Sequence, residues 1–256
     1  MSRTLAGILA VRNGIELDYS WEEAGKSLLG VCDELVLDDC DSTDGTWERM
    51  QEWASVDPRI TLAKYPWTNP VGTNQWWPEF LNHARQHAKA DHILHLDADE
   101  AIHENDYGLI RSAANNGSTL FLKRLNFWRD PQHLIPEGFC CGTKVLRMAP
   151  ANMPIPSDYP WEPAEATMKQ AVDSSIRVFH YGFLRRREAF FKKAKVVQNI
   201  WAGDYDPRLR QAESSSGNWM ENPVVSEWIN NLSRYTGTHP EAAHMWLLER
   251  GYSLKS

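Results

Sequence analysis

Short apolar runs alternate with helical patterns over roughly the first hundred residues of this chain. Four of the runs have the length and composition of strands, at residues 5–11, 34–39, 59–65 and 92–97. The stretches between them place apolar residues at helical spacing, as Phe80, Leu81 and Ala84 do. Strands and helices in alternation predict β-α-β units, and therefore an α/β fold with a mostly parallel central sheet covered by helices on both faces.

The pattern changes after residue 118. Further strands are predicted at 118–128, 143–148 and 175–183, and further helices at 185–200, 223–234 and 240–250. Residues 149–166 hold five prolines and little periodicity, which favours a long loop or lid. We find no internal repeat and no distinct linker. The predicted organisation is a single domain over 1–200, divided near residue 125, followed by a helical C-terminal extension over 201–256.

Composition narrows the class of protein. An apolar content of 42% can supply a sizeable core, and no run of 18 apolar residues predicts a transmembrane segment. The N-terminus lacks the pattern of a signal peptide, so a cytoplasmic location is expected. The cysteines at 32, 40, 140 and 141 show no paired metal-binding spacing, which fits a reducing compartment. The net charge of -7 argues against a protein whose main task is to grip nucleic acid.

One acidic segment, residues 36–46 (VLDDCDSTDGT), follows the second predicted strand. In open α/β sheets, ligands bind beyond the carboxyl ends of the strands, and a carboxylate there commonly accepts hydrogen bonds from a ribose or a base. A dinucleotide site is excluded, because residues 10–17 (AVRNGIEL) contain no G-x-G-x-x-G. A capped loop of solvated acids is the alternative.

A second acidic segment, residues 92–104 (HILHLDADEAIHE), ends the fourth predicted strand. Asp97 and Asp99 are separated by one residue, so in an extended segment both side chains would project to the same side. Grouped carboxylate oxygens suit Mg²⁺ or Mn²⁺, whose remaining ligands are usually substrate phosphates and water. The segment therefore suggests a substrate that bears a diphosphate, with an acidic turn capping the next helix as the alternative.

Together the two segments resemble family-2-type glycosyltransferases of the GT-A fold, closely over residues 5–125 and more loosely beyond. Those enzymes show a polar pair after the first strand, here Arg12 and Asn13. They also show an aspartate in a STDGT-like stretch, here Asp39, with Asp41 at the position where the family commonly has glycine. Their D-x-D motif corresponds to Asp97 and Asp99.

The resemblance implies roles for individual residues. It implies a nucleotide-sugar site made by Ala10, Arg12, Asn13, Asp39, Asp41, Asp97, Ala98 and Arg185. It implies a metal site made by Asp97, Asp99 and His180, in which the imidazole favours Mn²⁺ over Mg²⁺. The basic residues Arg185, Arg186, Arg187 and Lys192 are candidates to stabilise the leaving phosphate. A solvated helix face is an equal alternative for this basic segment.

An inverting transfer also needs a base on the face of the sugar opposite the diphosphate. In similar enzymes this carboxylate comes from the loop before the late strand, which here contains Asp158, Glu162 and Glu165. We favour Glu162, which lies between Trp161 and Pro163. Glu100 is a further candidate because it adjoins the D-x-D motif.

The predicted function is metal-dependent transfer of a sugar, a hexose by expectation, from a nucleotide sugar to an acceptor hydroxyl, with inversion by single displacement. A UDP-sugar is the expected donor. The acceptor stays open among a glycan, a protein, a lipid-linked saccharide and a modified nucleic-acid base, and the tail is a possible homo-oligomer contact. A nucleotidyltransferase that makes sugar nucleotides is an alternative, but the Gly-rich basic loop that it needs after the first strand is missing. A non-catalytic carbohydrate-binding protein on the same fold is the other alternative.

Overall fold

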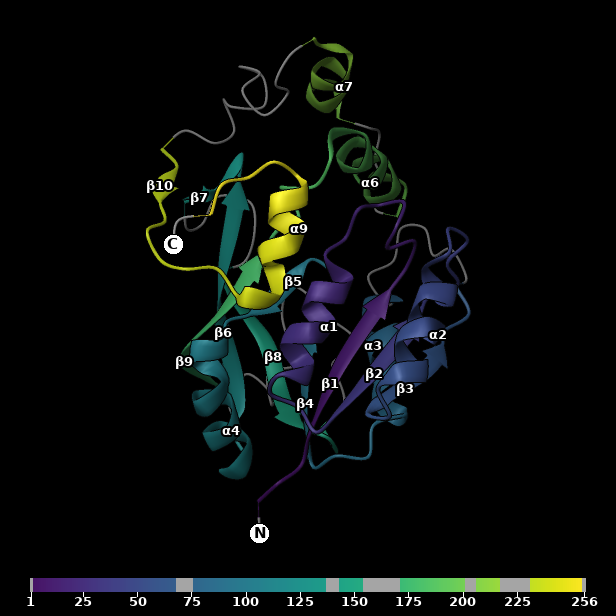
Figure 1. Ribbon diagram of the computed structural model, residues 1–256, viewed down its shortest axis with the longest axis vertical. Coiled ribbons are helices and arrows are strands. Elements are labelled where there is room, and N and C mark those ends of the chain that lie inside the picture. Colours follow the sequence, from purple (N-terminus) through teal and green to yellow (C-terminus); the bar gives the residue numbers. More distant parts are fainter. Residues whose placement is uncertain are drawn as a thin grey trace.

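The parallel part of the sheet confirms the predicted β-α-β units (Figure 1). This computed structural model describes residues 2–67, 76–136, 143–153, 171–200, 206–216 and 231–254. The strands β1 (Leu5–Val11), β2 (Glu34–Asp39), β3 (Ile60–Lys64) and β4 (His92–Leu96) pair in parallel in the order β3-β2-β1-β4. The helices α1 (Trp21–Leu29), α2 (Thr46–Val56) and α3 (Trp76–Gln86) lie between them in the chain.

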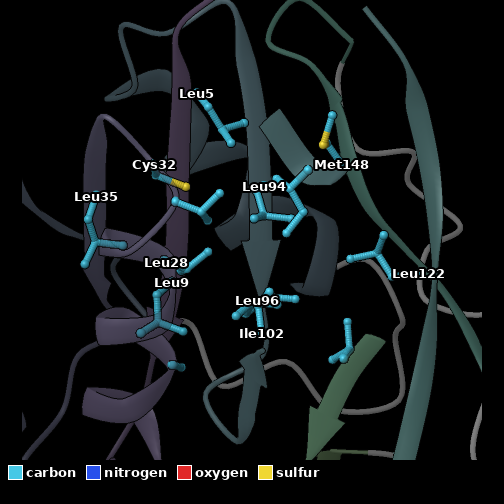
Figure 2. Packing of buried hydrophobic residues seen from close by; sticks show 14 of the residues in the cluster. Leu5, Leu9, Leu28, Cys32, Leu35, Leu94, Leu96, Ile102, Leu122 and Met148 are labelled. Carbon is cyan, nitrogen blue, oxygen red and sulfur yellow. The ribbon is translucent and has the colours of Figure 1, made fainter. Parts of the chain in front are cut away.

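Side chains of β1 alternate between two layers of core, which is why helices cover both faces of the sheet. Leu5, Leu9 and Val11 pack with Leu28 of α1 in the largest cluster, part of which Figure 2 shows. Ala6 and Ile8 pack on the opposite face with Ala84 of α3. Gly7 allows α1 to approach closely, because a Cβ there would lie 3.0 Å from Leu28 Cβ. Nearly continuous apolar strands of this kind are typical of a sheet buried on both sides.

The second half adds mostly antiparallel strands and completes a mixed sheet. Its elements are β5 (Glu100–Ile102), the 3₁₀ turn η1 (Glu104–Asp106), α4 (Tyr107–Asn115), β6 (Thr119–Trp128), β7 (Asp130–Leu134), β8 (Lys144–Pro150) and β9 (Ala171–His180). The strand β8 joins the two halves, since it is antiparallel to both β4 and β6. The long strands β6 and β9 run parallel to each other, and β5 is antiparallel to β9.

The predicted late strands are confirmed as β6, β8 and β9, whereas β5 and β7 were not predicted. The proline-rich segment at 149–166 begins inside β8, which continues to Pro150; residues 154–166 lie outside the described ranges. The predicted basic helix is α6 (Arg187–Ile200), so Arg185 and Arg186 precede it.

The tail folds against the sheet. It contains α7 (Pro207–Ser214), β10 (Ser233–Arg234), η3 (Glu241–Ala243) and α9 (His244–Glu249), and the last two confirm the helix predicted at 240–250. Most of the helix predicted at 223–234 lies outside the described residues, and its final two residues form β10 instead. Ala243, Trp246 and Leu247 pack with buried aromatic residues of β6 and β9. None of the described helices has both the length and the apolar character needed to cross a membrane.

Candidate active site

The loops that follow β1 and β2 meet at the carboxyl edge of the parallel strands. Asn13 joins them: its backbone N–H donates to Ser42 Oγ at 2.8 Å, and its side-chain Oδ1 accepts from Thr43 N at 2.9 Å. Asp44 adds a second link, because its carboxylate accepts from Glu16 N at 2.7 Å and from Thr46 N at 3.1 Å. Asn13 therefore fixes the two loops that carry the predicted nucleotide-binding residues.

Asp39 and Arg12 leave polar atoms available at this junction. Asp39 is fully buried; its Oδ2 accepts from Ser42 N at 3.2 Å, and its Oδ1 has no partner among the described residues. Arg12 lies over the ring of Trp67 at 4.5 Å, and its Nη1 is likewise buried without a partner in the described part of the chain. Because buried polar atoms are normally hydrogen-bonded, an acceptor and a donor without partners in these two loops point to a ligand with complementary groups.

Asp41 has a backbone conformation that glycine adopts more readily than other residues. Its φ is +60°, in the left-handed region that side chains disfavour. The turn after β2 therefore keeps a glycine-like shape, although the sequence departs from glycine at this position.

The D-x-D segment is a turn rather than an extended strand. Residues 97–99 leave the strand conformation after β4, and Glu100 N donates to Asp97 O at 3.0 Å to close the turn. The expectation that both carboxylates project to the same side from an extended segment was therefore wrong. Their side chains contact different groups, Asp97 with Arg147 and Asp99 with Arg185.

Asp97 belongs to a buried ionic network with Glu100. Arg147 donates to Asp97 Oδ2 at 2.5 Å and to Glu100 Oε1 at 2.8 Å, and Arg124 lies 3.0 Å from the same Glu100 oxygen. Glu100 Oε2 accepts from Asp97 N at 2.9 Å. Burial raises the pKa of Asp97 to about 6, against the opposing effect of Arg147. Since both oxygens of Glu100 are engaged, Glu100 supports the turn.

Asp99 lies among cations. Arg185 Nη2 donates to its Oδ2 at 2.7 Å, and Lys193 Nζ donates to the same oxygen at 2.8 Å. Burial alone would raise the pKa of Asp99, but the positive groups around it, Lys193 foremost, outweigh burial and hold this pKa well below its usual range. Asp99 is therefore a carboxylate at neutral pH.

Two of the three predicted metal ligands lie together. His180 Nε2 is 3.5 Å from Asp99 Oδ1, a separation that two ligands of one ion can have when each bond is about 2.1 Å. Burial and the charge of Arg124 hold the pKa of His180 well below its usual range, which keeps the imidazole in the neutral form that binds metals. Gly182 leaves space here, since a Cβ would lie 2.5 Å from His180 Nε2 and 2.7 Å from Asp99 Oδ2.

Asp97 does not complete this pair. No set of three His, Cys, Asp or Glu side chains that could hold a metal ion occurs within the ranges that the structure describes. The predicted trio of Asp97, Asp99 and His180 is thus not assembled, because Asp97 is drawn to Arg147 instead. Asp99 and His180 fit a divalent cation as a pair.

The other basic candidates contact different parts of the chain. Arg186 pairs with Asp18, Arg187 donates to backbone carbonyls near the end of α7, and Lys192 pairs with Glu16. Ala10 is half-buried near the end of β1, and Ala98 is buried in the turn. The three base candidates, Asp158, Glu162 and Glu165, lie outside the described residues.

Sequence reasoning missed Lys193, Arg124 and Arg147. Lys193 lies in the basic helix that the sequence predicted, but no local pattern distinguishes it from the adjacent Lys192. Arg124 and Arg147 carried no comparable signal. They come from β6 and β8, and only the pairing of these strands brings them to the D-x-D turn.

No protein-family model matches this sequence, and no curated protein matches it. Solved structures do resemble it. The mannosyltransferase PcManGT from Pyrobaculum calidifontis, in complex with GDP-Man and Mn²⁺, has a TM-score of 0.50 at 15% identity, over 88% of this chain and 68% of that chain. S. aureus TarS 1-349 has a TM-score of 0.45 at 15% identity, over 89% and 71% of the two chains, and its complex with UDP-GlcNAc has a TM-score of 0.46. The chain therefore has an α/β fold with a mixed, mostly parallel sheet that matches solved GT-A glycosyltransferases at low identity.

Proposed function

We propose that the chain transfers a sugar from a nucleoside diphosphate sugar to an acceptor hydroxyl, with inversion by single displacement. The observation that carries the proposal is the environment of Asp99: a buried carboxylate after β4 with His180 on one side and two cations on the other. A protein of the same fold binds GDP-Man and Mn²⁺. We assign the nucleotide-sugar half to about residues 1–125 and the acceptor half to about residues 126–200.

We assign each residue a role according to its position in the site. Asp39 Oδ1 and Arg12 Nη1 offer an acceptor and a donor to the base or ribose, and Trp67 closes that side. Asp99 and His180 would hold Mn²⁺ or Mg²⁺, which when bound supplies positive charge against the leaving diphosphate. Arg185 and Lys193 add positive charge beside the same place. The acceptor hydroxyl gives its proton to a carboxylate, which we assign to Glu162 in preference to Glu165 or Asp158.

A panel of nucleotide sugars, with UDP-sugars first, tests the proposal. Hydrolysis or transfer in the presence of Mn²⁺ is expected for at least one donor, and Asp99→Asn should lower kcat/KM at least about a hundredfold by removing charge at the metal and diphosphate. Asp57→Asn is the matched control. Asp57 precedes β3, at the opposite end of the parallel strands, and it pairs with Arg59. The function would have to be abandoned if no donor reacts and Asp99→Asn leaves Mn²⁺-dependent nucleotide binding unchanged.

A further inference from the structure

The positively charged side chains in contact with Asp99 outnumber the carboxylates that face them. The Asp99 side chain is 5% exposed, and its Oδ2 accepts hydrogen bonds from both Arg185 and Lys193. His180, counted as neutral, adds no charge. One carboxylate therefore faces two cations, which leaves a surplus of one positive charge at a partly buried position.

The neighbouring network does not absorb this surplus. Asp97 and Glu100 are matched by Arg147 and Arg124, two carboxylates against two guanidinium groups. Asp18, in the loop after β1, is engaged by Arg186 and Arg250. Within the residues that the structure describes, the positive charge at Asp99 thus has no second carboxylate in ion-pairing contact. An uncompensated buried charge is unfavourable, and a small anion would relieve it.

The side chains of Arg185 and Lys193 differ in how tightly the surrounding residues hold them. The Arg185 side chain is 1% exposed and is held by the backbone oxygens of Gly182 at 2.7 Å and Leu17 at 2.6 Å, with its guanidinium 4.4 Å from the Tyr19 ring. The Lys193 side chain is 26% exposed, and its ammonium contacts only Asp99 and the Tyr19 ring among the partners given by the described residues. Arg185 is therefore fixed, whereas the flexible Lys193 stem can reorient at little energetic cost.

We propose that Arg185 and Lys193 form a diphosphate site that works without a divalent cation. In the donor-free protein Lys193 neutralises Asp99, and when a diphosphate arrives Lys193 turns from Asp99 to the phosphate oxygens while Arg185 stays in place. This inference deepens the proposed function and rests on it for the identity of the natural ligand, a nucleoside diphosphate sugar.

An order of binding follows from the charges. A free divalent cation approaching Asp99 meets two positive side chains, so it binds weakly by itself. A diphosphate brings the negative charge that removes this repulsion. Metal affinity should therefore rise once the diphosphate is bound, and the diphosphate should bind even when metal is removed.

Calorimetry of inorganic pyrophosphate in EDTA tests the site without depending on the base or sugar. The wild-type chain should bind pyrophosphate, and Lys193→Met should weaken this binding at least about tenfold, because one charge-assisted contact is lost. Lys192→Met is the matched control: the adjacent lysine is exposed and pairs with Glu16, so binding should stay within about twofold. Lys193→Arg keeps the charge and should retain most of the affinity. Thermal unfolding of each variant verifies that it is folded.

Each outcome separates the two proposals. This inference is overturned if the wild type does not bind pyrophosphate in EDTA, or if Lys193→Met binds it equally well. In that case, turnover of a nucleotide sugar with Mn²⁺ would leave the proposed function standing. Lys193-dependent pyrophosphate binding without turnover of any donor in the panel would keep the anion site and remove glycosyl transfer. Tight binding of Mn²⁺ alone would contradict the order of binding.

Discussion

Asp41 stores backbone strain two residues beyond the buried end of β2. Its φ of +60° lies in the left-handed region, where a side chain raises the energy by roughly 1–2 kcal/mol. Aspartate tolerates this region better than most residues, since its short polar side chain can bond locally. The position therefore accepts glycine or aspartate and resists branched residues.

Substitution of Asp41 should reveal that strain. We expect the free energy of unfolding of Asp41→Gly to lie within about 1 kcal/mol of the wild-type value. Asp41→Val should lower the free energy of unfolding by about 1–2 kcal/mol, because valine strongly disfavours a positive φ. Urea titration measures both. Thr43→Val, an exposed position in the same loop, is the control and should change the free energy of unfolding by less than about 0.5 kcal/mol. Equal effects of valine at 41 and 43 would show that the turn is not strained.

Sequence alone predicted the acids of the site better than their partners. Asp97 and Asp99 stand out because carboxylates after an apolar strand are unusual and chemically specific. The cations that contact these two carboxylates come from β6, β8, the loop after β9 and α6, all later in the chain. Long-range pairing decides those contacts, and local periodicity carries no information about it.

At the scale of elements, α9 is joined to the loop after β1 by one buried ionic contact. Arg250 follows α9; its side chain is 6% exposed, pairs with Asp18 and donates to Trp246 O at 2.7 Å. Asp18 also accepts from Arg186 N at 2.7 Å, immediately after Arg185. The tail is thus connected through Asp18 to the segment that carries a cation of the site.

Removal of this contact should loosen the tail. We expect Arg250→Met to lower the free energy of unfolding by about 2–3 kcal/mol, since Asp18 loses one of two buried cationic partners. Arg208→Met is the control, because Arg208 makes an exposed pair with Asp206 and should cost less than about 1 kcal/mol. Denaturant unfolding gives both values, and limited proteolysis should cleave the Arg250 variant faster near residues 235–254. Similar losses for the two variants would refute the special role of Arg250.

Element prediction succeeded where the pattern was strong and repeated. The four parallel strands and α9 followed from apolar runs and helical spacing. The strands β5 and β7 were missed, because three and five residues are too few for a reliable alternation. In addition, β5 is defined by its pairing with the distant strand β9. The helix predicted at 223–234 gave way to β10 at its end, where residues 233–234 pair with β7.

At the scale of the whole molecule, buried histidines link folding to pH. Burial lowers the pKa of His92, His95, His103, His180 and His239. His239 lies between Tyr181 Oη and Pro131 O, each at 2.9 Å, and its pKa falls to about 4. The unfolded chain takes up protons on these residues at a higher pH than the folded chain does, so acid favours unfolding.

The buried histidines should therefore lower the free energy of unfolding as pH decreases from about 6.5 to about 4, against the opposite contribution of Asp97, whose pKa is raised to about 6. His239 alone accounts for up to about 3 kcal/mol over that window, because its folded pKa lies below its unfolded value. Urea titrations at a series of pH values measure the slope. His239→Gln should flatten it while the other histidines maintain a residual slope. An unchanged slope would show that His239 does not titrate on unfolding.

The packing of the tail has a consequence for synthesis on the ribosome. Ala243, Trp246 and Leu247 pack with Phe127, Phe179 and Tyr181, which lie in or directly after strands made much earlier. While translation proceeds, the parallel strands β1 to β4 can pair, but this aromatic surface stays open until residues 240–250 emerge. Nascent chains stalled before that point should bind hydrophobic-surface chaperones, and chains released after it should not.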